Sequence, residues 1–313
     1  MKITLILAMI LLTGSAQSAI FSVSPGQSIQ SAVDAMSQGD TIEVQNGTYY
    51  ENINIAKKIV LRGIRHPIVN AQDNGGALTL SSNGIVVEGL IITNSSASGS
   101  GINVSNISRD DVIEENIIVR NRGNGIDLWA SENNSILNNI ILNNMGNGIS
   151  LWSCDRTEVG NNFISNNSGS GIFGGSVNSS IKGNTVNANH GSGIVLLNSY
   201  NNIIANNAAS SNNQTGIMLI FGSNNSIIQN TIVENINSGL SMLFSWKNNI
   251  TKNTVRDNFE GIYLGNSSEI NVLSENDVEN NRLGVHLVSS SNNTLLNNYI
   301  INNTYNVFDD GKN

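Results

Sequence analysis

Two adjacent segments carry the pattern that decides the fold: NTVNANHGSGIVLLNSYNNIIAN at residues 184–206 and NAASSNNQTGIMLIFGSNNSIIQ at residues 207–229. Each begins with an asparagine and reaches a glycine followed by isoleucine nine residues later. Outward from these segments, a glycine followed by a branched aliphatic residue recurs at intervals of 22 to 24 residues. These pairs begin at Gly101, Gly125, Gly148, Gly171, Gly193, Gly216, Gly239, Gly261 and Gly284. The chain is therefore built on an internal repeat.

The repeat predicts short strands rather than helices. Apolar residues alternate after each glycine, as Ile194 and Leu196 do, which is typical of a strand with one buried face. A strand that returns in every repeat pairs in parallel with its copy in the next one. We therefore predict an all-β, parallel β-helix (β-solenoid) of roughly eleven coils, each of 22–24 residues.

Asparagine is the most unusual feature of the composition, at 56 of 313 residues. Stacked asparagines can hydrogen-bond one another along the coil axis, because each amide has a donor and an acceptor. Asparagine also tolerates the positive φ that tight corners require. We therefore assign the most regular column to a structural ladder rather than to ligand binding. Its members are Asn116, Asn139, Asn162, Asn184, Asn207, Asn230, Asn253, Asn276 and Asn298.

The net charge and the cysteine content exclude some classes of partner and of metal site. A net charge of −8 argues against a nucleic acid partner, which requires a basic face. Cys154 is the single cysteine, which excludes an intramolecular disulfide and a cysteine-based metal cluster. No cofactor is expected. A Ca²⁺ site is conceivable at Asp110–Asp111 and Glu114–Glu115, although a solvated turn is the favoured interpretation.

The N-terminus has the features of a secretory signal peptide over residues 1–19. Lys2 precedes an apolar run from Ile3 to Leu12, and small and polar residues follow. The run is too short to cross a bilayer comfortably. We expect cleavage between Gln17 and Ile20 and no membrane span afterwards. The expected location is secreted or at the cell surface, and periplasmic in an organism with an outer membrane.

The mature chain, 20–313, is predicted to be a single domain. An amphipathic pattern over 28–38 predicts a capping helix, with Ser28 as N-cap and Gly39 as stop. Irregular first coils are expected over 40–100, regular repeats over 101–304 and a short tail over 305–313. No capping helix follows the last repeat, so either Phe308 and its neighbours cover it, or a partner makes end-to-end contact there.

The N-terminal motifs resemble those of a known family. They are Ile29-Gln30-Ser31-Ala32-Val33, Gly39-Asp40-Thr41-Ile42, Gly47-Thr48-Tyr49, Glu51-Asn52-Ile53 and Leu61-Arg62-Gly63. Together with the repeats, they resemble NosD-type β-helix proteins, which are similar to the carbohydrate-binding and sugar-hydrolase (CASH) domains and the pectin-lyase-like group. The resemblance implies a right-handed helix, the usual hand of parallel crossovers. It does not imply one activity, because the family includes binding, surface and enzymatic members.

One apolar column stands out as a candidate binding site. Trp129 and Trp152 fall on adjacent coils, where two rings about 5 Å apart would suit sugar stacking. Asp127 and Ser150 precede them in the column expected to take sugar hydroxyls. Phe221 and Phe244 extend the apolar surface. The alternative is a corner buried by its own loops.

We therefore predict an exported, non-catalytic protein that binds a surface or extracellular polysaccharide or an envelope protein, or that builds the cell envelope. The rival is a polysaccharide lyase, hydrolase or epimerase. Its support is weak, because the stacked Glu234 and Asp257 are better explained as an exposed, ion-paired rim. Copper handling is weaker still, because His66, His190 and His286 are far apart in the repeat count.

Overall fold

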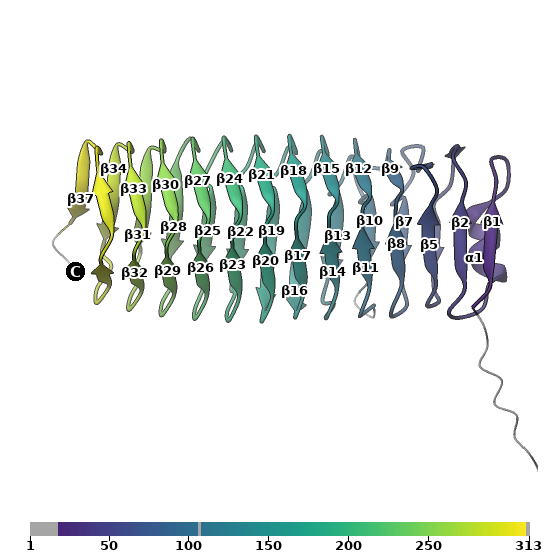
Figure 1. The fold of residues 1–313 in the computed structure, drawn as a ribbon, viewed down its shortest axis with the longest axis horizontal. Helices are drawn as coiled ribbons and strands as arrows, with labels where there is room; N and C mark the ends of the chain where they lie inside the picture. Colours follow the sequence, from purple (N-terminus) through teal and green to yellow (C-terminus); the bar gives the residue numbers. More distant parts are fainter. Residues whose placement is uncertain (1–17, 106–107, 311–313) are drawn as a thin grey trace, which may run out of the picture.

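The computed structural model describes residues 18–105 and 108–310, which form one elongated rod of stacked coils (Figure 1). Every strand pairs in parallel with the equivalent strands of neighbouring coils, which builds three sheets along the rod. The predicted parallel β-helix is confirmed. Sheet A has 13 strands, so the expected eleven coils are too few. One additional strand of this sheet, at residues 20–23, precedes the expected start near residue 40. At the other end, the predicted tail adds a strand to another sheet.

We call the three sheets A, B and C, in the order in which their first strands occur in the chain. Sheet A consists of β1(Ile20–Val23), β2(Thr41–Val44), β5(Val60–Gly63), β8(Val86–Glu88), β11(Val112–Glu114), β14(Ser135–Leu137), β17(Glu158–Gly160), β20(Ser180–Lys182), β23(Ile203–Ala205), β26(Ser226–Ile228), β29(Asn249–Thr251), β32(Val272–Ser274) and β35(Thr294–Leu296). Sheet B consists of β3(Thr48–Tyr49), β6(Ile68–Asn70), β9(Ile91–Thr93), β12(Ile117–Val119), β15(Ile140–Leu142), β18(Phe163–Ser165), β21(Thr185–Asn187), β24(Ala208–Ser210), β27(Thr231–Val233), β30(Thr254–Arg256), β33(Asp277–Glu279) and β36(Tyr299–Ile301). Sheet C consists of β4(Ile53–Ile55), β7(Leu78–Leu80), β10(Ile102–Val104), β13(Ile126–Trp129), β16(Ile149–Asp155), β19(Ile172–Val177), β22(Ile194–Leu197), β25(Ile217–Ile220), β28(Ser238–Leu243), β31(Glu260–Gly265), β34(Leu283–Val288) and β37(Tyr305–Asp309).

The Gly-Ile repeats form sheet C in the predicted register. Ile194 pairs with Ile217, and Leu196 pairs with Leu219. All four side chains are fully buried, so the alternating apolar residues form the core inside the coils. Burial of such a continuous aliphatic column is the main stabilising term of the fold.

The asparagine ladder is confirmed, and Asn207 shows how it works. Its Oδ1 accepts hydrogen bonds from the backbone N–H and the Nδ2 of Asn184, both at 3.0 Å. Its Nδ2 donates to the carbonyl of Ile181 at 2.9 Å and to Oδ1 of Asn230 at 3.0 Å. The positive φ belongs to the preceding residue, here Asn206 at 55°, and not to the ladder asparagine as the sequence suggested.

A second buried asparagine column, which includes Asn144 and Asn212, follows sheet B. A third column lies before sheet A and was not predicted. Its asparagines are Asn134, Asn202, Asn225, Asn248, Asn271 and Asn293. Thr157 and Ser179 interrupt the column, and Ser179 Oγ accepts the backbone N–H of Thr157 at 3.0 Å. This interruption conceals the period in the sequence.

Asp111 occupies the first position of this third column, which corrects the prediction of a solvated turn. Its side chain is buried, and its Oδ1 accepts the backbone N–H of Ile85 at 2.8 Å, as ladder asparagines do. Oδ2 accepts a hydrogen bond from Ser108 Oγ. Burial raises the pKa of the Asp111 carboxyl to about 6, against the opposing effect of these hydrogen bonds.

The N-terminal end of the rod is covered by α1(Ile29–Ala35), which is shorter than the predicted 28–38 (Figure 1). Ser28 is the N-cap as predicted, and its side chain accepts from the backbone N–H of Ser31. Glu51 accepts the next free amides, from Ile29 and Gln30. The helix ends before Gly39, which adopts a φ of 91° in the following turn. The coils already begin at β1, ahead of the expected start near residue 40.

At the other end, the predicted tail over 305–313 is largely a strand. β37 pairs with β34, with Phe308 opposite His286, so Phe308 extends sheet C instead of folding over the last coil. The end-to-end contact expected there stays a prediction. The predicted signal peptide lies almost entirely outside the described residues. Within the described part, no helix is long and apolar enough to span a membrane.

Candidate functional site

The candidate site is the corner where the chain leaves sheet C and turns toward sheet A. Six aromatic residues gather along it, and we call this set the aromatic corner: Trp129, Trp152, Tyr200, Phe221, Phe244 and Trp246. Trp129 is 58% exposed, Phe221 48% and Phe244 41%, so the corner is not buried by its own loops. Trp152 is half-buried. Tyr200 and Trp246 were missed, although both lie in one column, paired through Ser223.

The rings differ in geometry along the corner. The centroids of Trp129 and Trp152 lie 6.3 Å apart with planes tilted by 40°, which is farther and less parallel than the predicted stack. Phe173 holds the Trp152 ring in an edge-on contact at 5.5 Å. Phe221 and Phe244 are stacked, at 4.9 Å and 14°. These contacts fix the rings as a rigid apolar surface.

Phe221 and Phe244 also have an unusual backbone. Their φ angles are 54° and 50°, in the left-handed region that bulky residues rarely adopt. Ala130 and Asn198 occupy the same turn in other coils with φ of 47° each. A conformation of this kind costs on the order of 1 kcal/mol or more for a residue with a bulky side chain.

Asp127 and Ser150 do not occupy equivalent environments. They pair side by side on the outer face of sheet C, as predicted. Ser150 is only 1% exposed, so it is not available to bind a sugar hydroxyl as expected. Asp127 is half-buried and lines a groove with Arg122 and Asn124. Its Oδ1 has no hydrogen-bond partner among the described residues.

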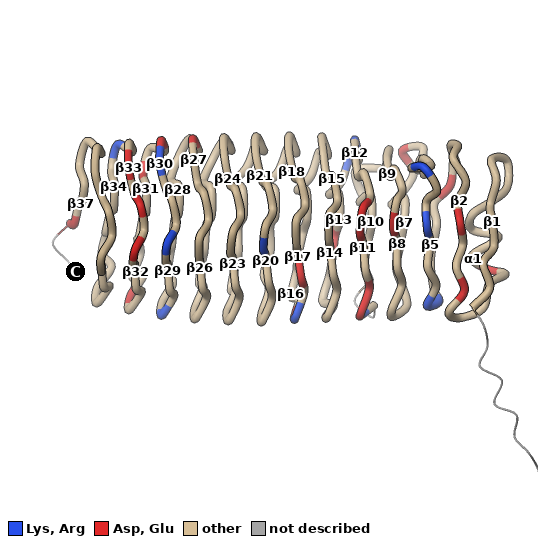
Figure 2. Tube along the Cα trace, viewed as in Figure 1, with Lys and Arg blue, Asp and Glu red and all other residues tan. Residues whose placement is uncertain are grey.

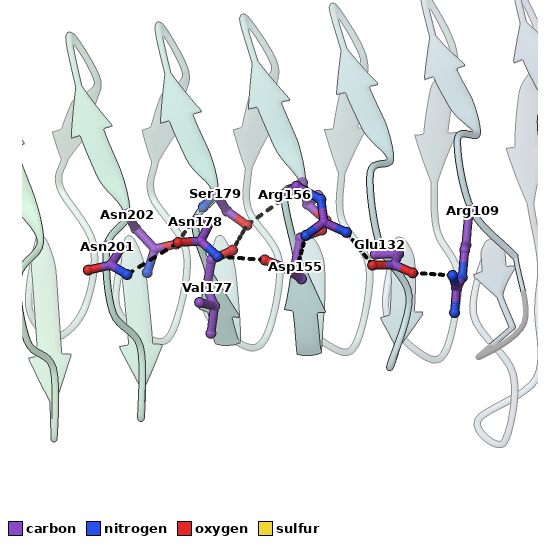
Figure 3. A network of polar contacts seen from close by, with 10 residues as sticks. Arg109, Glu132, Asp155, Arg156, Val177, Asn178, Ser179, Asn201 and Asn202 are labelled. Atoms are coloured by element: carbon purple, nitrogen blue, oxygen red, sulfur yellow. Dashed lines mark hydrogen bonds and ion pairs between the residues drawn. The ribbon is translucent and has the colours of Figure 1, made fainter.

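A network of polar side chains runs beside the aromatic corner (Figure 3). Glu132 forms ion pairs with Arg109 and Arg156, and Arg156 also pairs with Asp155. Asn178 donates to Asp155 Oδ1 at 3.0 Å. The acidic groups of this edge are therefore neutralised by arginines of the same edge.

Between the aromatic and polar residues lies a groove of about 550 Å³. Trp152 and Tyr200 stand at its two ends along the rod, with Gly175 between them. Asp155 and Asn178 form part of its wall. A volume of this size falls within the range of small-molecule sites.

A second cluster, missed by the sequence, lies on the outer face of sheet C near the last coils. His286 Nδ1 lies 2.7 Å from Glu260 Oε1, and Ser238 Oγ donates to Glu260 Oε2 at 2.7 Å. The Tyr263 ring lies 5.1 Å from that of His286. Burial and the charge of Glu260 raise the pKa of Tyr263. Glu260 lies three residues before Tyr263, which is the residue in register with His286, so the repeat does not predict that Glu260 and His286 meet.

The acidic rim is exposed and partly ion-paired. Asp257 lies 3.7 Å from Arg256, and Glu234 accepts from Ser211 Oγ at 3.3 Å. Neither carboxylate lines one of the grooves described above.

The comparison with protein families finds one match. The model of NosD, described as a periplasmic copper-binding protein, matches residues 27–208 and 175–313. No curated protein sequence matches the chain.

Several solved structures share the fold at low identity. The A-module of the mannuronan C-5 epimerase AlgE4 of Azotobacter vinelandii has a TM-score of 0.81 and 17% identity, over 89% of this chain and 92% of that one. The periplasmic alginate epimerase AlgG has a TM-score of 0.61 and 15% identity, over 90% and 83%. PfbA, a surface adhesin of Streptococcus pneumoniae, has a TM-score of 0.61 and 13% identity, over 90% and 87%. These likenesses show the fold alone.

The histidines, the cysteine and the acidic residues of the described part of the chain do not form a copper site. Histidine, cysteine and methionine are the ligands copper prefers. Across 18–105 and 108–310, no three His, Cys, Asp or Glu side chains are grouped to hold a metal. His286 is bound to Glu260, and Cys154 is buried, where desolvation raises its pKa and disfavours the thiolate.

Proposed function

The chain belongs to the NosD family, and we propose that it is an exported β-helix protein whose aromatic corner binds polysaccharide at the cell surface without catalysis. The observation that carries this proposal is the set of aromatic rings along one corner of the rod, of which Trp129, Phe221 and Phe244 are largely exposed. Aromatic faces present a rigid apolar surface on which the C–H faces of sugar rings can stack.

The left-handed phenylalanines support a binding role over a purely structural one. Asparagine tolerates this conformation better than other residues with a Cβ, and Asn198 adopts it in another coil, so the turn gains nothing from a phenylalanine. Phe221 and Phe244 adopt the strained conformation and remain largely exposed. Burial of their rings in the core therefore does not offset the free-energy cost of the strain. Names of the structural neighbours agree with contact to polysaccharide or to a surface, since they include alginate epimerases and a surface adhesin.

The combined variant Trp129→Ala and Trp152→Ala is expected to weaken polysaccharide binding by about tenfold or more, because it removes two large anchoring rings that contact each other. Binding is measured by affinity electrophoresis against a panel of cell-wall and surface polysaccharides. Phe163→Ala is the matched control, because Phe163 is an exposed aromatic of sheet B, away from the corner. Equal binding by the tryptophan variant and the wild type would contradict the proposal.

A second candidate function has one specific observation in its favour. The Glu260–His286 pair beside Tyr263 provides groups that can exchange protons with a substrate. The rival activity is a polysaccharide lyase, hydrolase or epimerase. Incubation with acidic and neutral polysaccharides, with and without Ca²⁺, would reveal it as unsaturated, reducing-end or epimerised product. Loss of that product in His286→Gln would assign it to this cluster.

Export is the remaining part of the proposal. It rests on the apolar N-terminal run and agrees with the periplasmic description of the family. We expect the exported protein to begin between Gln17 and Ile20. N-terminal sequencing checks this, and exported protein that still begins at Met1 would refute cleavage.

A further inference from the structure

The groove at Gly175 exists because one coil is shorter at the corner. Six steps separate Ile172 from the left-handed residue Asn178, whereas seven separate Ile149 from Arg156 and Ile194 from Asn201. The pairing of β16 with β19 shifts accordingly between Leu151 and Cys154. The missing residue removes a side chain from the surface of this coil.

Gly174 makes the shortened corner sterically feasible. Its φ is 142°, and a Cβ at this position would lie 1.7 Å from the carbonyl oxygen of Leu151. Gly175 follows, again without a side chain, between Trp152 and Leu197 of the adjacent coils. The sequence Gly174-Gly175 therefore hollows the surface between two coils that carry large side chains.

The two aromatic residues at the ends of the groove are set apart by two coils. Successive coils repeat at roughly 4.8 Å, so Trp152 and Tyr200 are separated by about 10 Å along the rod. Tyr200 is 47% exposed, and Trp152 is held by Phe173. Tyr200 is in register with Val177 and Asp155, so the two rings are also offset by three residues across the strands. A ligand that contacts both rings therefore runs obliquely over two coils and is extended, as a polymer chain is.

The charge around the groove identifies the class of polymer. Asp155 is the one charged residue among those that line it, and its carboxylate is already paired with Arg156 and Asn178. From Thr157 to Trp246 the sequence holds only three charged residues, Glu158, Lys182 and Glu234. Figure 2 shows this central part of the rod almost without charge.

A uronate polymer carries a carboxylate on each acidic ring and is usually held by arginine, lysine or a metal ion. No lysine or arginine lines the groove, and an uncompensated carboxylate would face Asp155 there. A neutral sugar requires only ring stacking and hydrogen bonds, which Trp152, Tyr200 and the amides of Asn178 and Asn198 supply.

We propose that the Gly175 groove is a subsite for a neutral polysaccharide, with Trp152 and Tyr200 contacting its rings. This inference rests on the proposed function and narrows it. It differs from the acidic substrate named for the alginate epimerases that share the fold.

The test uses the exported chain and named probes in affinity electrophoresis. Xyloglucan, hydroxyethyl cellulose and dextran are the neutral probes, and alginate and polygalacturonate are the acidic ones. We expect at least one neutral polymer to bind about tenfold more tightly than either acidic polymer, with little change between low and high salt. Tyr200→Ala should weaken the neutral interaction by about tenfold, and Tyr299→Ala, an exposed tyrosine of β36, should not.

The outcomes separate the two proposals. Tighter binding of alginate or polygalacturonate overturns the neutral subsite and leaves polysaccharide binding standing. Unchanged binding by Tyr200→Ala, when the tryptophan variant loses binding, also overturns the subsite. If the wild type binds none of the probes or the wider panel, both proposals fail. Circular dichroism of each variant checks that the β-helix is intact.

Discussion

Asn207→Leu is expected to lower the free energy of unfolding by about 3 kcal/mol, because the buried groups that bond to the Asn207 amide have no alternative partner in the ladder. The buried backbone N–H of Asn184 donates to Asn207 Oδ1, and the Ile181 carbonyl accepts from Asn207 Nδ2. Each buried group left without its partner costs about 1–3 kcal/mol. The branched leucine side chain must also fit a column whose members repeat at coil spacing.

Denaturant unfolding followed by circular dichroism measures this effect. Asn213→Leu is the matched control, because Asn213 is exposed and lies one residue after the second buried asparagine column, at Asn212. We expect the control to change stability by less than about 0.5 kcal/mol. Equal effects of the two substitutions would show that the ladder bonds contribute no more than a surface amide.

Asp111→Asn is expected to stabilise the protein at neutral pH by up to about 3 kcal/mol. The pKa of Asp111 is raised from 3.8 to about 6, and each unit corresponds to about 1.4 kcal/mol. Below the lower value the carboxyl is protonated in both the folded and the unfolded chain. As the pH rises from about 4 to 6, the unfolded chain ionises first, so the folded state loses stability. Above the folded-state pKa of about 6, this loss of stability is complete.

Asparagine at position 111 removes the ionisation and completes the third column. Its Oδ1 can accept the Ile85 amide as Asp111 does, and its Nδ2 can donate to Ser108 Oγ. Unfolding curves at several pH values should therefore lose their downward slope between pH 4 and 6 in this variant. The control is Asp34→Asn, which removes an exposed carboxyl on α1, away from Asp111. If the stability of the wild type and that of Asp111→Asn depend on pH in the same way, the claim that burial raises the pKa of Asp111 is wrong.

The fold was readable from the sequence because its signals are strictly periodic. A glycine at each Gly-Ile pair is required by close packing: a Cβ on Gly216 would lie 2.4 Å from a methyl group of Ile232 and 2.7 Å from the Gly239 carbonyl. Ladder asparagines must align because each bonds the next. Both requirements act between neighbouring coils, so both appear as a fixed spacing. The exposed aromatic rings at Trp129, Phe221 and Phe244 followed from the same alignment.

Features that interrupt the 22–24-residue repeat could not be predicted from the sequence. The third column is interrupted at Thr157 and Ser179, so Asp111 was interpreted as a surface residue. Tyr200 and Trp246 lie one turn beyond the regular strand, where the alternation of inward and outward residues no longer applies.

By itself the sequence determined the coil, its register, the ladder and the exposed positions of Trp129, Phe221 and Phe244, because these depend on interactions repeated at every coil. Only the tertiary structure decided that Ser150 is buried, that Glu260 reaches His286, and that the short turn at Gly174-Gly175 opens a groove between Trp152 and Tyr200. Each of these depends on side-chain packing at one particular place on the rod, which no repeating pattern encodes.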